Sequence, residues 1–262
     1  MAAAATAAAQ AAAILTHPLM NDHMTNVLGI TSQPLRGRLI IAGFTDDIDR
    51  LSTRPGSFAI KACSGVRKSG GLPATLMSVE IEEDLINLVR WVRYTYIVTR
   101  PLAWADATVA DTRALGQWLD QLPPEADAQG PGKFKSIANF RELNDNLIQY
   151  LSVARSSAGF PLSHLIRAAG PPPADQGFGL PSFDEELATR GRLDGIYYAA
   201  SNKKLWNVIR DMCHETPAWT HVQPFARRFD GRRAHLALIS TYMGQDIQYT
   251  LRSTAESFDL QV

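Results

Sequence analysis

Apolar residues recur along most of the chain with the spacing of an amphipathic helix. A stripe of this kind follows Ser78, which is suited to an N-cap, and another covers residues 107–122. The clearest stripe consists of Phe140, Leu143, Leu147, Tyr150, Leu151 and Ala154. A period of about 3.6 residues places such side chains on one helical face, and no segment alternates as a half-buried strand does. The pattern therefore predicts an all-α, multi-helix protein.

Glycine, proline and low-complexity segments divide these predicted helices into parts. The first residues are almost pure alanine, and Ser69–Pro73 has the composition of a hinge. The predicted parts are a disordered, alanine-rich tail at 1–23, a small helical cluster at 24–68, and a helical domain at 78–262 with loops near 123–133 and 170–181.

Two predicted helices near the C-terminus supply a candidate core. Leu205 and Ile209 share one helical face, and a short connection through Trp219 allows the following helix to pack back on it. The expected structural core consists of Leu205, Trp206, Ile209, Leu238 and Tyr242.

Charge and cysteine content narrow the class of protein. The 262 residues include 26 basic and 26 acidic side chains, so net charge does not drive the protein onto nucleic acid or an anionic membrane. The two cysteines are too few for a disulfide-stapled secreted domain, and we expect a cytoplasmic protein. No window approaches the roughly 20 apolar residues of a membrane span, so no membrane partner is expected.

Motifs of the common enzyme classes are absent from the sequence. There is no Gly-rich phosphate loop, dinucleotide fingerprint or nucleophile elbow, so we predict neither catalysis nor a cofactor. Cys213, His214 and His221 form the densest group of metal-ligand types, but neighbouring helical residues point in different directions. Cys63 lies among basic residues without a histidine nearby to act as a base, and a buried, unreactive thiol is the simpler interpretation.

Two stretches are locally basic. Residues 54–68 contain four basic residues and no acid, and residues 203–233 contain seven basic residues against three acids. Either stretch can contact phosphates, and an ordinary charged surface is the alternative. The aromatic residues interleaved with the second stretch are expected in the core rather than as stacking platforms: Trp206, Trp219, Phe225 and Phe229. The candidate nucleic-acid-binding residues are Lys203, Lys204, Arg227, Arg228, Arg232 and Arg233.

Several segments of the C-terminal half, taken in their order along the chain, resemble those of a known family. The segments are Leu193-Asp194-Gly195-Ile196-Tyr197-Tyr198, Asn202, Leu205-Trp206-Asn207-Val208-Ile209, Trp219, the run from Asp230-Gly231-Arg232-Arg233 to Leu238, and Tyr242-Met243-Gly244. Together with Gly159–Arg167 and Val27–Ile30, they resemble gag-like proteins of copia-type LTR retrotransposons, as found in algal and protist genomes. The segments are structural rather than catalytic signatures.

The resemblance implies a helical, capsid-like, non-enzymatic protein that self-associates and packages RNA. Gag proteins of this kind often carry a C-terminal zinc knuckle of three cysteines and one histidine, which two cysteines cannot supply, so no metal is expected. Either a downstream segment is missing, or RNA packaging depends on basic patches alone. A host helical scaffold or adaptor that binds another protein is the alternative, and an enzyme with an unfamiliar helical site is a third interpretation.

Overall fold

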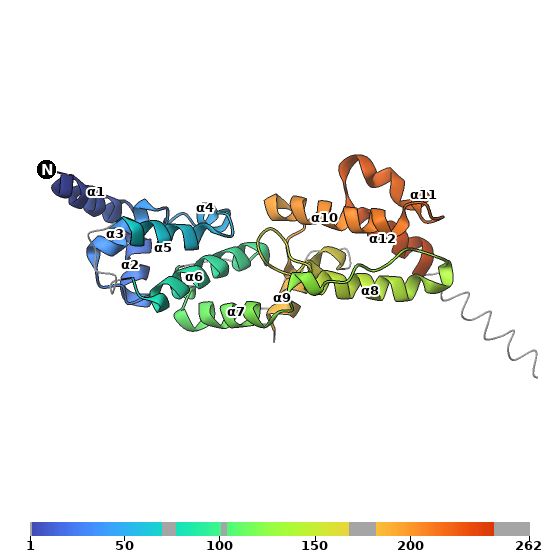
Figure 1. Ribbon diagram of the computed structural model, residues 1–262, viewed down its shortest axis with the longest axis horizontal. Coiled ribbons are helices and arrows are strands. Elements are labelled where there is room, and N and C mark those ends of the chain that lie inside the picture. The colour runs from blue at the N-terminus through green and yellow to red at the C-terminus, as the bar shows by residue number, and fades with distance from the viewer. Residues whose placement is uncertain (1, 70–76, 101–103, 168–181, 244–262) are drawn as a thin grey trace, which may run out of the picture. The chain divides into compact units, whose positions relative to one another are not determined.

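The structure is a computed structural model that describes residues 2–69, 77–100, 104–167 and 182–243 (Figure 1). These residues are mostly helical, and the only β-type pairing among them is an isolated bridge between Arg155 and Pro161. The predicted all-α class is confirmed. Within the described ranges, no helix is both long and apolar enough to cross a membrane. Residues 70–73 of the predicted hinge Ser69–Pro73 and the loop predicted at 170–181 lie outside the described residues.

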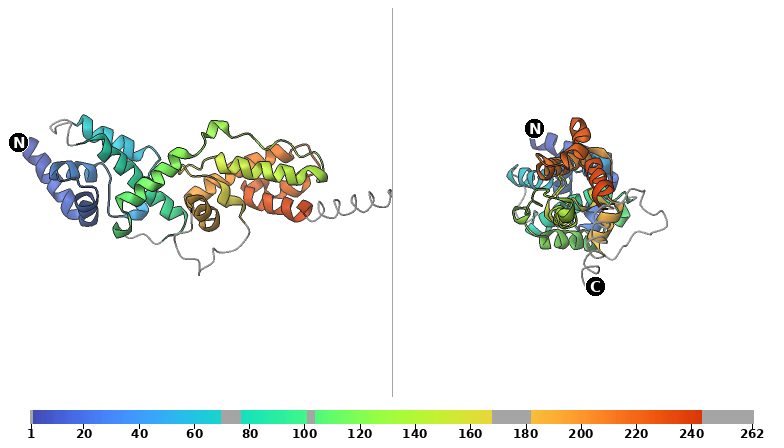
Figure 2. Two further views of the ribbon diagram at one scale, coloured as in Figure 1. Left: turned by 90° about the horizontal axis from the view of Figure 1, so that it is seen from below. Right: turned by 90° about the vertical axis from the view of Figure 1, so that its right-hand side faces the viewer.

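The chain divides into two compact units, residues 1–122 and 123–262 (Figures 1 and 2). The helices described in the first unit are α1 (Ala2–Thr16), α2 (Pro18–Asp22), η1 (His23–Val27), α3 (Gln33–Ile41), α4 (Ile48–Ser52), α5 (Phe58–Lys68), α6 (Val79–Ile97), η3 (Trp104–Asp106) and α7 (Val109–Gln121). Those described in the second are η4 (Glu125–Asp127), η5 (Ile137–Asn139), α8 (Phe140–Val153), η6 (Ser163–Ile166), α9 (Phe183–Arg190), α10 (Gly195–Cys213), α11 (Trp219–Val222), η7 (Gln223–Arg228), α12 (Gly231–Leu238) and η8 (Ile239–Met243).

The boundary between the two units lies between Leu122 and Pro123. Long-range contacts attach α6 to the preceding helices, so α6 and α7 belong to the first unit. Arg93 donates hydrogen bonds to the carbonyl oxygens of Arg54, at 2.9 Å, and Pro55. Arg67 of α5 forms an ion pair with Glu82 of α6. The amino-acid composition of the sequence does not predict these contacts.

The alanine-rich N-terminal segment is helical over the residues that the structure describes. Residues 2–16 form α1, which packs against α3, and residues 18–22 form α2. Gln10 is buried, and its backbone comes so close to Gly37 that a Cβ at Gly37 would lie 2.6 Å from the Gln10 Cβ. Alanine has the highest intrinsic helix propensity, so a low-complexity run of this composition is ready to become helical where it finds a surface.

Side-chain caps define several helix starts. The hydroxyl of Ser78 accepts a hydrogen bond from the Ile81 N–H at the start of α6, and Ser182 caps α9 through Glu185. Asn202 lies inside α10, which starts at Gly195. Its side-chain amide bonds to the residues around the start of α12.

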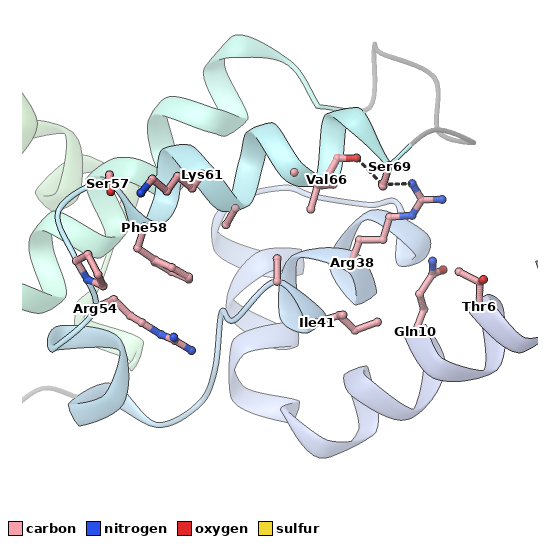
Figure 3. Close-up of a pocket in the computed structure, with 14 residues that line it drawn as sticks. Thr6, Gln10, Arg38, Ile41, Arg54, Ser57, Phe58, Lys61, Val66 and Ser69 are labelled. Carbon is pink, nitrogen blue, oxygen red and sulfur yellow. Dashed lines mark hydrogen bonds between the residues drawn. The ribbon is translucent and has the colours of Figure 1, made fainter.

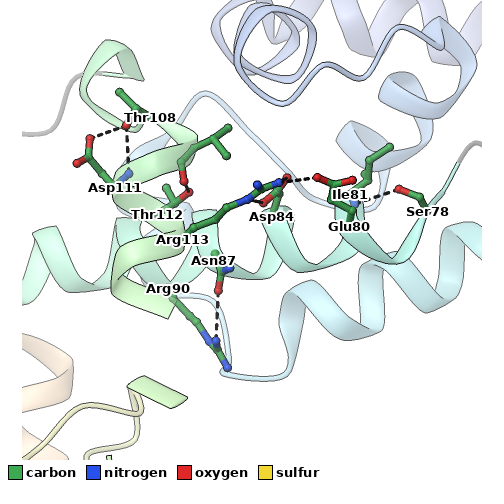
Figure 4. Close-up of polar contacts among 11 residues, drawn as sticks. Ser78, Glu80, Ile81, Asp84, Asn87, Arg90, Thr108, Asp111, Thr112 and Arg113 are labelled. Carbon is green, nitrogen blue, oxygen red and sulfur yellow. Dashed lines mark hydrogen bonds and ion pairs between the residues drawn. The ribbon is translucent and has the colours of Figure 1, made fainter. Parts of the chain in front are cut away.

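A polar network joins α6 to α7 (Figure 4). The guanidinium of Arg113 donates to both carboxylate oxygens of the buried Asp84, at 2.7 and 2.8 Å, and to Glu80 at 2.9 Å. These carboxylates raise the pKa of Arg113, so the cation is retained at all ordinary pH values. Two parallel hydrogen bonds fix the orientation of the pair as well as its distance.

The core of the second unit gathers around α8, α10 and α12. The five residues of the expected core are at most 5% exposed: Leu205, Trp206, Ile209, Leu238 and Tyr242. The Trp206 ring centroid lies 6.2 Å from that of Trp219. The ring of Tyr242 lies 4.9 Å from Phe134 and 5.3 Å from Phe140, between centroids. Aromatic contacts therefore connect Tyr242, which lies next to the last described residue, to Phe140 of α8.

Trp206→Ala should lower the free energy of unfolding by about 3–5 kcal/mol, because it leaves a large cavity in a closed core. Urea denaturation followed by circular dichroism measures the change. Phe229→Ala is the matched control, since the Phe229 ring is 47% exposed, and it should shift stability by about 0.5 kcal/mol or less. Equal shifts for the two variants would contradict the assignment of Trp206 to the core.

Arg113→Met should lower the thermal midpoint clearly more than Asp120→Asn does. The first change leaves the buried Asp84 carboxylate without its bidentate partner, whereas the second removes an exposed ion pair to Arg90 at 3.6 Å. Differential scanning calorimetry of the two variants makes the comparison. A smaller shift for Arg113→Met would show that the network does not hold α7 on α6.

Candidate nucleic-acid interface

The candidate interface is built where the chain turns from η7 into α12. Phe229 adopts a left-handed backbone conformation, φ 51° and ψ 41°, which ends η7 and redirects the chain. The carboxylate of Asp230 then caps α12 by accepting from the Arg233 N–H at 3.1 Å, and from the Asn202 side chain of α10 at 3.1 Å. The turn is thereby tied to the middle of α10.

Gly231 allows α12 to start directly against α10. A Cβ at this position would lie 2.3 Å from the backbone nitrogen of Trp206 and 2.7 Å from the carbonyl oxygen of Asn202. Both atoms belong to helical backbone and cannot move aside. Only glycine therefore permits this approach, which fixes where the side chains of the turn project.

Four cations and one aromatic ring lie exposed around this turn. Lys203, Arg227, Arg228 and Arg233 are all exposed. A depression of about 520 Å³ is lined by the three arginines together with Pro224, Phe225 and Asp230. Arg227 and Arg228 form no hydrogen bond or ion pair with any residue in the described ranges. Their guanidinium groups are therefore available to an anion, and we name Lys203, Arg227, Arg228, Arg233 and Phe229 the arginine turn.

The exposed ring of Phe229 completes the arginine turn. Lys203 Nζ lies 5.1 Å from the ring centroid, within the range of a cation–π contact. Sequence reasoning expected Phe229 in the core, because interleaved aromatics usually are. Its backbone is left-handed, which is uncommon for a residue other than glycine, and the ring is exposed instead of buried. The neighbouring sequence gives no sign of this backbone conformation.

Two of the predicted nucleic-acid-binding residues serve other purposes. Arg232 is only 7% exposed, and its guanidinium donates to the carbonyl oxygens of Leu165 and Arg167, at 2.7 and 2.8 Å. Lys204 points to the Glu125 carboxylate and the Arg155 carbonyl oxygen. Arg232 is therefore a buried structural residue, and Lys204 ties α10 to η4 rather than facing an open surface. Both corrections depend on which way a helical side chain points.

The other residues considered for chemistry do not form a reactive centre. Burial raises the pKa of both the Cys63 and Cys213 thiols to about 12, which keeps them protonated. His214 contacts the Trp219 ring, whereas His221 contacts Tyr242, so neither joins Cys213. Within the described part of the chain, no group of three or more histidine, cysteine or carboxylate side chains could hold a metal ion.

Two histidines of the second unit are buried as neutral rings. Burial lowers the pKa of His164 to about 4, and the nearby cations of Arg167 and Arg232 act in the same direction. Burial also lowers the pKa of His235 to about 4, again assisted by Arg232. His235 Nε2 lies 2.9 Å from the amide oxygen of Asn144, which can only accept, so the neutral ring carries its proton there.

Acid should destabilise the protein below neutral pH. As pH falls through about 6.5, the unfolded chain protonates these histidines while the folded chain does not, so the free energy of unfolding decreases. The expected loss between pH 7 and pH 5 is about 2 kcal/mol for each histidine. Urea denaturation across this range should give a flatter profile for the His164→Gln/His235→Gln variant. Replacement of the exposed His221 by Gln is the control and should leave the pH dependence of the unfolding free energy unchanged. If the double variant shows the same pH dependence as the unchanged chain, the assignment of His164 and His235 is wrong.

Comparison with known proteins adds no further assignment. No family model, curated protein or solved structure matches the chain.

Proposed function

We propose that this protein is a non-enzymatic, gag-like structural protein that self-associates and binds single-stranded RNA through the arginine turn. The observation that carries the RNA-binding part is an exposed Phe229 ring that contacts Lys203 and directly follows Arg227 and Arg228, which line a depression together with Arg233. Self-association is supported by the family resemblance of the sequence.

The composition of the arginine turn favours RNA over other anions. Arginine guanidinium groups bind phosphate oxygens, and an exposed aromatic ring stacks on an unpaired base. A single strand presents phosphates and unstacked bases together, whereas the bases of a duplex are stacked inside. Asp230 neutralises only part of the cluster. Its carboxylate forms an ion pair with Arg233 at 3.5 Å, whereas Lys203, Arg227 and Arg228 form no ion pair with any described residue.

Binding to a labelled 20-nucleotide oligouridylate should be strongly salt-dependent. Four phosphate contacts give a slope of log K against log salt of about −3, and replacing Arg227, Arg228 and Arg233 with Gln should flatten it to about −1. Phe229→Ala should weaken binding by about 5- to 150-fold, the loss of one stacked base, without changing the slope. Fluorescence anisotropy between 50 and 300 mM salt separates the two effects.

Controls keep the RNA test specific. Lys135 and Arg141 are exposed cations of the same unit, outside the arginine turn, and replacing both with Gln should leave affinity and slope unchanged. Arg232 is excluded from the variant set because it is buried and its loss would disturb the fold. A salt slope that stays the same in the triple arginine variant would overturn the proposed interface.

Self-association is tested by light scattering. Capsid-like assemblies form through repeated modest interfaces, so the measured mass should rise with protein concentration and rise further when RNA gathers the subunits. A mass that remains monomeric at high concentration, with and without RNA, would contradict assembly. A helical adaptor that binds another protein would then be the better proposal.

A further inference from the structure

An apolar groove in the first unit has no role in the function proposed above (Figure 3). It is a hollow of about 640 Å³ bounded by α1, α3 and α5. Its apolar lining includes Phe58, Ala62 and Val66 of α5 and Ile41 of α3, whose side chain is 58% exposed. An exposed isoleucine next to an apolar groove is typical of a surface to which a partner binds.

One face of α5 supplies much of the groove. Its lining residues follow helical spacing along the whole helix: Phe58, Lys61, Ala62, Gly65, Val66, and Ser69 just beyond its end. At 1.5 Å per residue this face is about 18 Å long, enough to contact about three turns of another helix. Gly65 lies in the middle, and nothing stands within 4 Å of where its Cβ would be. The centre of the groove is therefore open.

The charged residues of the groove are all cations. Arg38, Arg54 and Lys61 line it, and none of its described lining residues is a carboxylate. Arg54 lies over the Phe58 ring at 5.0 Å, and its Nε is buried without a hydrogen-bond partner in the described part of the chain. Arg38 donates to the Ser69 hydroxyl at 2.8 Å. Lys61 forms no ion pair with any described residue.

The cations stand at both ends of the apolar wall. Figure 3 shows Arg54 and Lys61 near Phe58, and Arg38 beside Ser69 at the far end of α5. A lipid or fatty acid carries its charge at one end only and would leave the other end unpaired. A nucleic acid would find a single aromatic ring there, that of Phe58, which is only partly exposed and lies under the Arg54 guanidinium. A peptide helix with an apolar stripe flanked by acidic residues matches both features.

We propose that this groove binds an acidic amphipathic helix of a partner protein. The apolar stripe of that helix would cover Ile41, Ala62 and Val66, and its carboxylates would pair with the cations at each end. The proposal does not depend on RNA binding, which it assigns to different residues in the other unit.

The test selects ligands from a displayed library of random 16-residue peptides, using the full chain as bait. The enriched peptides should carry net negative charge, with apolar residues three and four positions apart. Gly65→Phe should fill the groove and weaken the binding of labelled enriched peptides at least tenfold in fluorescence anisotropy. Lys61→Glu should also weaken their binding at least tenfold, because it places a negative charge beside the acidic residues of the peptide.

Controls distinguish loss of binding from loss of fold. Lys68→Glu reverses an exposed charge of α5 outside the groove and should change affinity less than twofold. Gly65→Phe should not lower the thermal midpoint, because the site is open and glycine is unfavourable within a helix. The triple arginine variant of the other unit should retain full peptide binding, so failure of the RNA proposal leaves this one intact.

Several outcomes would overturn the proposal. They are failure to enrich any peptide, recovery of basic or uncharged peptides, and enriched peptides that bind the Gly65→Phe chain as well as the unchanged one. Binding of oligouridylate, or of phosphatidylglycerol vesicles, that is lost in both Gly65→Phe and Lys61→Glu would assign the groove to nucleic acid or lipid instead.

Discussion

The second unit depends on the contact between α10 and the start of α12. Gly231 lets two helical backbones meet where any Cβ would collide, and Asn202 satisfies polar groups on the α12 side of that contact. Arg232 then extends from the same junction to the carbonyl oxygens of η6. A buried cation costs free energy unless it is hydrogen-bonded, so these carbonyl contacts are what make its burial tolerable. The arginine turn therefore begins at a position that this junction fixes.

Periodicity in the sequence predicted the long helices and their buried faces. The stripe from Phe140 to Ala154 corresponds to α8, and Ser78 caps α6 where a short polar side chain preceded an apolar repeat. These features are local, because a helix makes its hydrogen bonds within a few residues. What the sequence did not reveal depended on distant contacts. The packing of α1 against Gly37, and the attachment of α6 to α5 through Arg67 and Glu82, are examples.

In the candidate RNA site, too, the sequence predicted the local feature but not the properties that depend on distant contacts or on backbone conformation. Composition located the basic stretch at residues 203–233, yet it treated Arg232 and Arg233 as equivalent. They are neighbours on a helix and point in different directions, so one is buried and the other exposed. Phe229 escaped prediction for a related reason: its exposure follows from a left-handed backbone angle at one residue. Neither property leaves a pattern in the surrounding sequence.

Helix α1 forms one wall of the apolar groove through Thr6 and Gln10, and this makes its docking part of any binding event there. Gln10 is the only buried residue among those of α1 whose exposure is described, so few large apolar side chains hold the helix in place. A molecule that occupies the groove only when α1 is docked adds RT ln(1 + [L]/Kd) to the free energy of α1 release. Conversely, the apparent affinity of the groove is reduced in proportion to the fraction of chains in which α1 is docked, so a change that undocks α1 weakens binding. The alanine-rich segment thus sets the affinity of the groove by how tightly it holds to Gly37.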